Sequence, residues 1–195
     1  SVLTPDGTPV KTGGGLLSLT EPWPSMLRGI WGDPKRYEEV YWHRFDTYFA
    51  GDGATIDSDQ YYKVLGRVDD VLNVAGHRIG TMEVESAIVD YQGVAEAAVI
   101  GIHDDIKGNA IVAFVILKES MSVSTDLEDN VKAFVCDQIG AIARPKRVIF
   151  TPELPKTRSG KIMRRVLRCI AEDDPVGDTS TLANPDIVDF LIDTV

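Results

Sequence analysis

The spacing of apolar and polar residues divides the chain into two parts, which differ in the length of their apolar runs. In residues 1–66, short apolar runs are separated by turn signals such as Pro5-Asp6-Gly7. The pattern predicts a short helix over 34–43, with a proline in its first turn, and strands at 48–50 and 61–65. This part is therefore expected to be rich in β structure and to have little continuous core of its own.

The second part has longer apolar runs. A hairpin is predicted over 71–78, and strands rich in Val, Ile and Ala are predicted over 94–102 and 110–117. Thr81 is expected to cap a helix over 82–91. The apolar stripe of this helix consists of Met82, Ala87, Ile88 and Tyr91.

The last third of the chain adds three helices and a strand. Thr125 and Glu128 have the spacing of a capping box, a short strand is predicted over 147–150, and helices are predicted over 162–172 and 185–194. The helix after the capping box should bury one face, made of Leu127, Val131, Phe134 and Val135. The helix over 162–172 should point its arginines outward, namely Arg164, Arg165 and Arg168, and bury Ile162, Met163, Val166 and Ile170. The predicted class is α+β, with a small mixed sheet covered by helices.

Composition and charge narrow the function. The chain has 195 residues and a formal net charge of −10, which argues against a general nucleic-acid binder. Residues 144–168, however, hold nine bases and one acid, a local charge of +8 that indicates an anion site or a solvated basic face. No stretch approaches the roughly 20 apolar residues of a membrane span, and the N-terminus has no signal-peptide pattern. Because the chain begins without Met, in what reads as the middle of a strand-and-turn region, we expect it to be a piece of a longer protein.

Few residues carry an independent catalytic signal. Cys136 and Cys169 have no CxxC spacing and predict neither a zinc site nor a disulfide. The three histidines, His43, His77 and His103, lack triad partners, and His77 is expected to support a turn. Lys161 follows a glycine and precedes a predicted helix, where a phosphate could bind, yet the segment is not a Walker A loop.

Three motifs in a fixed order change this picture. They are the segment PKTRSGKIMRR at 155–165, the segment GRVDDVLNVAGHR at 66–78 and the segment YFAGD at 48–52. Together they resemble the signatures of AMP-forming acyl-CoA synthetases, members of the adenylate-forming superfamily. The segments GTMEVES at 80–86 and GDTSTLA at 177–183 resemble the acetyl-CoA synthetase subfamily in particular. The resemblance covers nearly the whole chain.

The resemblance implies a domain organisation and an activity. Residues 1–68 would be the β-rich end of a large N-terminal adenylation domain, and 69–195 a mobile α+β cap that turns about a hinge at Asp69. The implied substrates are acetate, ATP with Mg²⁺, and CoA, and the products are acetyl-CoA, AMP and pyrophosphate. The fragment alone is expected to be inactive, because the acyl pocket lies outside it. The alternatives are a propionyl- or other short-chain acyl-CoA synthetase, and a non-catalytic fragment that serves as a target of acetylation and deacetylation.

The resemblance also implies roles for single residues. Asp52 would bind the ribose hydroxyls of ATP, Arg67 and Arg78 would contact the nucleotide, and Lys161 would be the adenylation lysine. The same lysine would be acetylated by a protein acetyltransferase and restored by a deacetylase. No nucleic-acid or membrane partner is implied, and the implied location is cytoplasmic, with an organellar or nuclear pool as the alternative.

Two further sites follow from the resemblance less directly. Ala75 and Gly76 would lie along the pantetheine arm of CoA. Ala75 stands where relatives commonly have a serine, and Cys136 and Asp137 stand where they have bases, so backbone contacts to CoA are expected rather than contacts from these side chains. A cation site would use the backbone carbonyls of Val89, Tyr91 and Val94.

Overall fold

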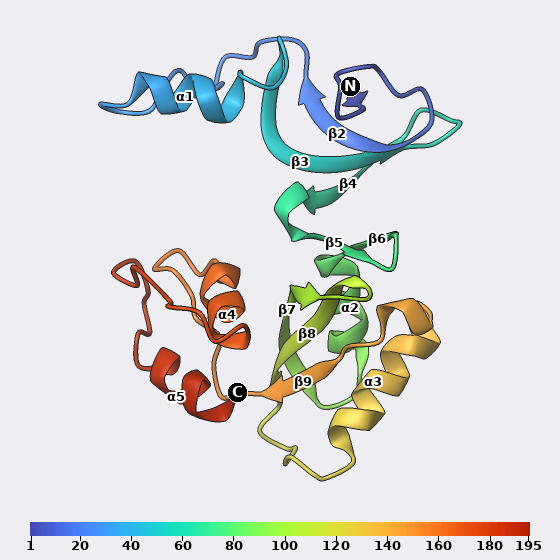
Figure 1. Ribbon diagram of the computed structural model, residues 1–195, viewed down its shortest axis with the longest axis vertical. Coiled ribbons are helices and arrows are strands. Elements are labelled where there is room, and N and C mark those ends of the chain that lie inside the picture. Colours follow the sequence, from blue (N-terminus) through green and yellow to red (C-terminus); the bar gives the residue numbers. More distant parts are fainter. The chain divides into compact units, whose positions relative to one another are not determined.

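The structure is a computed structural model that describes residues 1–195, with the side chain of Asp69 excepted. It comprises two compact units, Ser1–Val71 and Leu72–Val195 (Figure 1). The division lies close to the border predicted at residue 68. The α+β class predicted from the sequence is confirmed, because each unit is built around a sheet and the second unit carries helices on both faces of its sheet.

The first unit is a four-stranded antiparallel sheet in the order β1-β2-β3-β4. Its strands are β1 (Val2–Leu3), β2 (Gly13–Leu19), β3 (Tyr48–Ile56) and β4 (Tyr62–Arg67). Helix α1 (Pro34–Tyr41) begins at a proline, as predicted, and the Asp33 side chain caps it by accepting the amide of Arg36 at 3.0 Å. The short 3₁₀ turn η1 (Val68–Asp70) follows β4.

The core of the first unit is small. It consists of two clusters of buried side chains, Leu3, Leu16, Phe45 and Phe49 in one and Val2, Ala54 and Ile56 in the other. Helix α1 has no buried residue. The sequence prediction of a β-rich part with little core is therefore confirmed.

Gly15 in β2 allows β1 to approach closely. A Cβ at this position would lie 2.4 Å from the carbonyl oxygen of Leu3, which is backbone and cannot rotate away. We expect Gly15→Ala to lower the free energy of unfolding by about 1–3 kcal/mol, measured by chemical denaturation. Gly29→Ala is the matched control, because nothing lies within 4 Å of a Cβ there. Equal stability of the two variants would contradict this account of β1–β2 packing.

The second unit contains a mixed five-stranded sheet. Its strands are β5 (Val71–Val74), β6 (His77–Gly80), β7 (Val94–Asp104), β8 (Gly108–Leu117) and β9 (Arg147–Phe150). The order is β6-β5-β8-β7, and β9 pairs parallel with β8 while β5 and β7 pair antiparallel with it. Strand β8 therefore lies at the centre of the unit.

Helices cover both faces of this sheet (Figure 1). Helices α2 (Thr81–Asp90) and α3 (Leu127–Gln138), with the 3₁₀ turn η2 (Ala141–Ala143), pack on one face. Helices α4 (Arg164–Ala171) and α5 (Ile187–Thr194) pack on the other. Alternate residues of β8 enter opposite cores, so Ile111 and Ala113 face the first and Val112 and Phe114 the second. The unbroken apolar run of this strand follows from its burial on both faces.

The outer edge of β7 is covered by side chains rather than by another strand. Glu85 accepts the amide of Val99 at 2.8 Å, and Glu172 accepts the amide of His103 at 2.9 Å. Between them, Nε of Arg168 donates to the carbonyl of Gly101 at 3.3 Å. One backbone group on each of Val99, Gly101 and His103 is thus satisfied by a side chain, from α2, from α4 and from the residue after α4.

Both predicted N-terminal caps are wrong. Thr81 is the first residue of α2 rather than its cap, and its hydroxyl is buried without a hydrogen-bond partner, while Gly80 takes the cap position. Asp126, not Thr125, precedes α3, and the Glu128 carboxylate is held by Lys132 and by the Val148 amide. A side chain engaged in this way cannot turn back to close a capping box.

The predicted apolar stripes are partly corrected. Met82 is 58% exposed, because Val84 takes the inner face of α2 beside Ala87 and Ile88. Phe134 is half-buried and packs edge-on against Tyr91, with ring centroids 5.4 Å apart. Other positions follow the prediction, and the buried residues of α3 are Leu127, Val131 and Val135.

Glu128 makes the stability of the second unit sensitive to acid. The hydrogen bond from Lys132, followed by that from the Val148 amide, holds the pKa of Glu128 below its ordinary value. Because the folded-state pKa is lowered, this stabilisation is complete above the unfolded pKa of about 4.3 and is lost as pH falls through the folded pKa.

We therefore expect Glu128→Gln to reduce the fall in the free energy of unfolding below about pH 4.3. Denaturation at a series of pH values measures this fall, and the exposed Glu119→Gln is the control. An unchanged pH dependence in Glu128→Gln would show that the contacts of this carboxylate do not contribute.

Candidate adenylate site

Asp52 and Arg67 are directly paired residues of β3 and β4, so their side chains lie on the same face of the first sheet. The Arg67 guanidinium donates to the carbonyl of Ala50 and lies over Gly51, where a Cβ would come within 2.8 Å of it. Gly51 is required here for two reasons. Any side chain would collide with the guanidinium, and its φ of +86° is one that other residues rarely adopt. A carboxylate and a guanidinium are thus brought together at one end of the hairpin.

Aromatic side chains gather beside this pair. The rings of Tyr41 and Tyr48 stack with centroids 5.2 Å apart, and Trp23 and Trp42 meet Tyr48 edge-on. Partial burial raises the pKa of the Tyr48 phenol, and the neighbouring Tyr41, Tyr37 and Asp52 raise it further. The sequence analysis did not single out this cluster, because its rings come from a loop, a helix and a strand.

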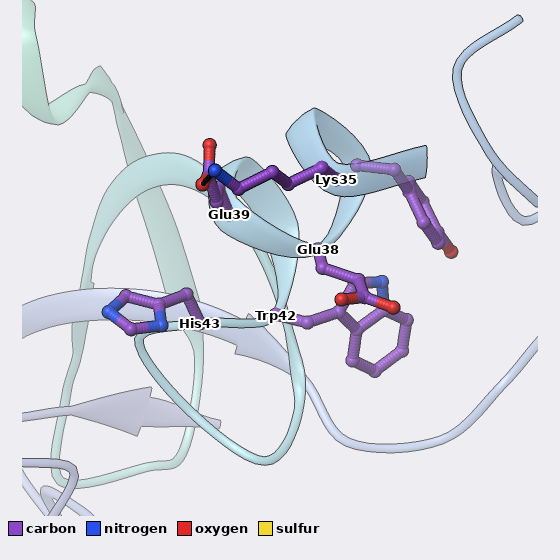
Figure 2. Close-up of a pocket in the computed structure, with 6 residues that line it drawn as sticks. Lys35, Glu38, Glu39, Trp42 and His43 are labelled. Carbon is purple, nitrogen blue, oxygen red and sulfur yellow. Dashed lines mark ion pairs between the residues drawn. The ribbon is translucent and has the colours of Figure 1, made fainter. Parts of the chain in front are cut away.

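An open hollow of about 660 Å³ lies on α1 next to the aromatic cluster. Figure 2 shows the side chains of Lys35 and Glu39 side by side on α1. The Lys35 ammonium and the Glu39 carboxylate form an ion pair at 3.4 Å. The indole Nε1 of Trp42 is buried without a hydrogen-bond partner. The lining residues are Lys35, Tyr37, Glu38, Glu39, Trp42 and His43, and none is among the predicted site residues.

Ala75 and Gly76 form the two-residue turn between β5 and β6. Both have positive φ, +48° and +85°, as a tight hairpin turn requires. The Ala75 amide donates to the carbonyl of Lys107 at 2.7 Å, which ties the turn to the β7–β8 connection. Nδ1 of His77 lies 3.3 Å from the carbonyl of Ala75, so this histidine supports the turn, as predicted. Arg78 follows on β6 with an exposed side chain.

Lys161 lies in a short, internally bonded loop. The backbone amide of Thr157 donates to the carbonyl of Lys161 at 2.8 Å, and the Lys161 amide donates to the Thr157 hydroxyl at 3.1 Å. A bridge between Lys156 and Ile162 closes the loop. Helix α4 therefore begins only at Arg164, and Lys161 does not lie directly at a helix start as predicted.

Most bases of the segment at 144–168 are bound within the fold, to carboxylates or to backbone carbonyls. Arg164 binds Glu85 through Nη2 at 2.8 Å, Lys156 binds Glu96 at 2.7 Å, and Arg165 donates to the carbonyls of Val176 and Asp178. Of the three arginines predicted to point outward, Arg165 is exposed, whereas Arg164 and Arg168 are half-buried, and each of the three joins α4 to another segment. Among the described side chains of this segment, those of Arg158 and Lys161 are exposed and make no ion pair or hydrogen bond. Within the described side chains of this segment, Arg158 and Lys161 are therefore the cations that need not leave a partner to meet an anion.

The predicted site residues fall in both units, with Asp52 and Arg67 in the first and Ala75, Gly76, Arg78 and Lys161 in the second. Residues 83–161 match the family model of the AMP-binding enzyme C-terminal domain. The chain belongs to the adenylate-forming superfamily.

Several relatives in this superfamily match nearly the whole chain. An acetyl-coenzyme A synthetase of Gemmatimonas aurantiaca is 56% identical over 99% of this chain, and one of Streptomyces coelicolor is 56% identical over 92%. The chain spans only 30% and 28% of the length of these two relatives.

Solved structures of adenylate-forming enzymes share the fold. The anthranilate CoA ligase AuaEII, in complex with anthranoyl-AMP, matches with a TM-score of 0.75 and 31% identity over 87% of this chain and 32% of its own. ATP-bound MatB from Rhodopseudomonas palustris matches with a TM-score of 0.73 and 28% identity over 88% of this chain and 33% of its own.

The remaining predictions for single residues stay predictions. The side chain of Asp69 lies outside the described part of the structure, although its backbone belongs to η1. Val89 lies in the last turn of α2, where carbonyls lack partners within the helix, and the Tyr91 carbonyl accepts the Val94 amide at 3.1 Å. Backbone carbonyl oxygens are of the kind that binds hard cations, and the cation site implied by the resemblance stays a prediction.

The second unit also has a hollow lined by four cations, which the sequence analysis missed as a group. Arg144 and Lys146 belong to the basic segment singled out above, but Lys107 and Lys132 come from the β7–β8 turn and from α3. No local pattern connects these segments.

Cys136 and Cys169 are both free thiols. None of the described helices has the length and apolar character needed to cross a bilayer.

Proposed function

We propose that this chain is the C-terminal part of an AMP-forming acetate–CoA ligase. In the first half-reaction, the carboxylate of acetate attacks the α-phosphorus of ATP, which forms acetyl-AMP and releases pyrophosphate. In the second, the CoA thiol attacks the acetyl carbonyl and AMP leaves. The observation that carries the proposal is the 56% identity to an acetyl-coenzyme A synthetase over 99% of this chain.

Lys161 is proposed as the residue that promotes adenylation. Acetate is already ionised, so the lysine has no proton to remove, and its ammonium group instead offsets the negative charge that gathers between carboxylate and α-phosphate. Its exposure and its freedom from ion pairs in the described structure support this role, since no carboxylate has to be displaced before it meets the substrate. The bonded loop reduces the conformational entropy lost when the ammonium is positioned.

Asp52, Arg67 and Arg78 are proposed to bind the nucleotide. A carboxylate at position 52 can accept hydrogen bonds from both ribose hydroxyls. Arg67 lies on the paired strand, and a guanidinium there can meet the phosphates or the ribose without moving the backbone. Arg78 is exposed on β6, next to the turn at Ala75 and Gly76 that is proposed to lie along the pantetheine arm of CoA. Mg²⁺ enters with ATP as part of the nucleotide substrate, and no residue of this chain is assigned to it.

The two units are proposed to be the end of a large adenylation domain, residues 1–68, and its mobile cap, residues 69–195. Asp69 is proposed as the hinge about which the cap rotates between the two half-reactions. Its backbone lies in η1, directly before the division at Val71, and short connections between compact units are where hinges occur.

Asp69→Pro in the whole protein is expected to slow one half-reaction much more than the other. Proline fixes φ near −65° and restricts the preceding residue, so the connection can reach only one of two orientations. Adenylation and thioester formation are measured separately, the second with supplied acetyl-AMP, and Asp69→Ala serves as the flexible control. Unaltered rates in both steps would rule out a hinge at this residue.

A second role is supported by the exposure of Lys161 at a loop tip. A protein acetyltransferase could reach this lysine and a deacetylase could restore it, and acetylation would remove the charge that adenylation needs. We propose this as regulation of the same site, and we propose a cytoplasmic location, which the two free thiols support.

Acetate-dependent exchange of pyrophosphate into ATP tests the proposed function. The whole protein should catalyse this exchange, and the 195-residue chain alone should not, because it spans about 30% of its relatives' length. Parallel reactions with propionate and butyrate test the short-chain alternative. Exchange supported by propionate but not by acetate would overturn the assignment of the substrate, and exchange by the isolated chain would overturn the assignment of the acyl pocket to another part of the protein.

A further inference from the structure

The base of the loop that carries the proposed adenylation lysine is bonded to a segment that follows α4. Thr157 forms an isolated antiparallel bridge with Leu182, and the amide of Ala183 donates to the carbonyl of Lys156 at 2.8 Å. Residues 182–184, which we call the clamp segment, lie between α4 and α5 and outside the residues that match the family model. The loop is therefore held in part by residues beyond that match.

The Asn184 side chain makes three hydrogen bonds to the residues that lead into this loop. Its Oδ1 accepts the amide of Lys156 at 3.1 Å. Its Nδ2 donates to the carbonyl of Leu154 at 3.0 Å and to the carboxylate of Glu153 at 2.8 Å. Because a backbone amide only donates and a carbonyl only accepts, these partners fix the orientation of the carboxamide. One half-buried side chain thus binds the chain on both sides of Pro155.

Apolar packing and an ion pair also hold the base of the loop. Leu154 and Leu182 are 1% and 5% exposed and belong to the same core cluster as the buried residues of α4 and α5. The Lys156 ammonium binds the carboxylate of Glu96 in β7 at 2.7 Å, which ties the base to the sheet as well. The base can therefore shift only if buried apolar contacts or these polar bonds are broken.

The position of Lys161 depends on this base through Thr157. The Thr157 amide donates to the carbonyl of Lys161, and the amides of Gly160 and Lys161 donate to the carbonyl and the hydroxyl of Thr157, at 2.8 and 3.1 Å. Residues 158–161 are exposed, so the tip of the loop is ordered by these bonds rather than by burial. A shift of the base should therefore displace the Lys161 ammonium together with the tip.

We propose that Asn184 is a positioning residue for acetate adenylation, an inference that rests on the proposed function. Asn184 acts through Lys161 rather than on the substrate, because it holds the base of the loop and so keeps the ammonium where carboxylate and α-phosphate meet. Stabilisation of a transition state by one charge falls steeply when the charge is displaced, and a misplacement of about 1 Å can cost on the order of 100-fold in rate. Part of the catalytic geometry of the whole protein is thus set by the clamp segment.

Asn184→Ala in the whole protein is expected to slow acetate adenylation about 10-fold in kcat, while the KM for ATP changes less than about twofold. Thioester formation from supplied acetyl-AMP should stay unchanged, because the charge of Lys161 is assigned to the first step alone. A variant that merely lowers the amount of folded protein would instead reduce both half-reactions by the same factor. Asn130→Ala is the matched control, because Asn130 is exposed on α3 of the same unit.

A double variant tests whether Asn184 acts through Lys161. Once Lys161 is replaced by alanine, the further change Asn184→Ala should slow adenylation less than about twofold, because the group that it positions is gone. Losses that multiply in the double variant would overturn the proposal. Equal losses in the two half-reactions of Asn184→Ala, or unaltered adenylation in that variant, would overturn it as well.

Hydrogen–deuterium exchange of the backbone amides gives a readout that does not depend on activity. In Asn184→Ala the amides of Gly160 and Lys161 should exchange at least about fivefold faster than in the unaltered whole protein, while those of β8 keep their rates. Unchanged rates at the loop would overturn the proposal even if adenylation were slowed. If the unaltered protein shows no acetate-dependent pyrophosphate exchange, the proposed function fails, and the amide rates alone decide whether Asn184 holds the loop.

Discussion

Lys161→Ala in the whole protein is expected to slow acetate adenylation by about 100- to 1,000-fold, while thioester formation from supplied acetyl-AMP stays nearly unchanged. The asymmetry follows from the chemistry of the two steps. Negative charge crowds between acetate and the α-phosphate only in the first step, and Lys161 is the residue proposed to offset it. Acetate-dependent pyrophosphate exchange measures the first step, and release of acetyl-CoA measures the second.

Arg158→Ala provides the control for this experiment. Arg158 is an exposed cation of the same loop that makes no ion pair in the described structure, so it reports the effect of removing any positive charge from the loop tip. We expect its loss to change adenylation far less than the loss of Lys161. Equal losses in the two half-reactions of Lys161→Ala would contradict the assigned role.

The largest effect on stability is expected from Glu85→Ala, which should lower the free energy of unfolding by about 3–5 kcal/mol. Glu85 and Arg164 are only 14% and 21% exposed, and the variant removes the carboxylate to which the Arg164 guanidinium donates through Nε and Nη2. It also removes the acceptor of the Val99 amide on β7. Denaturant-induced unfolding followed by circular dichroism measures the change.

Glu83→Ala is the matched control, because Glu83 is exposed on the same helix and should change stability little. A double variant in which Glu85 and Arg164 are both replaced by leucine separates the ion pair from the packing. It should recover part of the loss, because it removes both charges of this pair together. A Glu85→Ala variant as stable as Glu83→Ala would show that the pair adds nothing to the fold.

Local sequence patterns predicted the structure correctly where that structure depends on a single segment. The strand β8 and the hairpin over 71–78 depend on a few consecutive residues, and both were predicted. The motif that contains Lys161 pointed to the correct superfamily for the same reason.

The errors arose where distant segments compete for one side chain. Glu128 has the spacing of a capping box. Its carboxylate instead accepts the backbone amide of Val148, which lies 20 residues further on, in β9. Arg164 and Arg168 lie on the polar side of a helical wheel, yet α2 and β7 provide Glu85 and the Gly101 carbonyl as partners. The four cations of the hollow are likewise assembled from three separate segments. Sequence spacing carries no information about such contacts, because they depend on the tertiary fold.

The covered edge of β7 has a consequence for how molecules of this protein meet. An exposed edge of eleven residues would offer a template on which the strand of a second molecule could add by hydrogen bonding. Glu85, Arg168 and Glu172 occupy its amides and carbonyl at the positions where such a strand would bind. We infer that these side chains, besides holding the helices, keep the chain from assembling edge to edge into larger β-sheet aggregates.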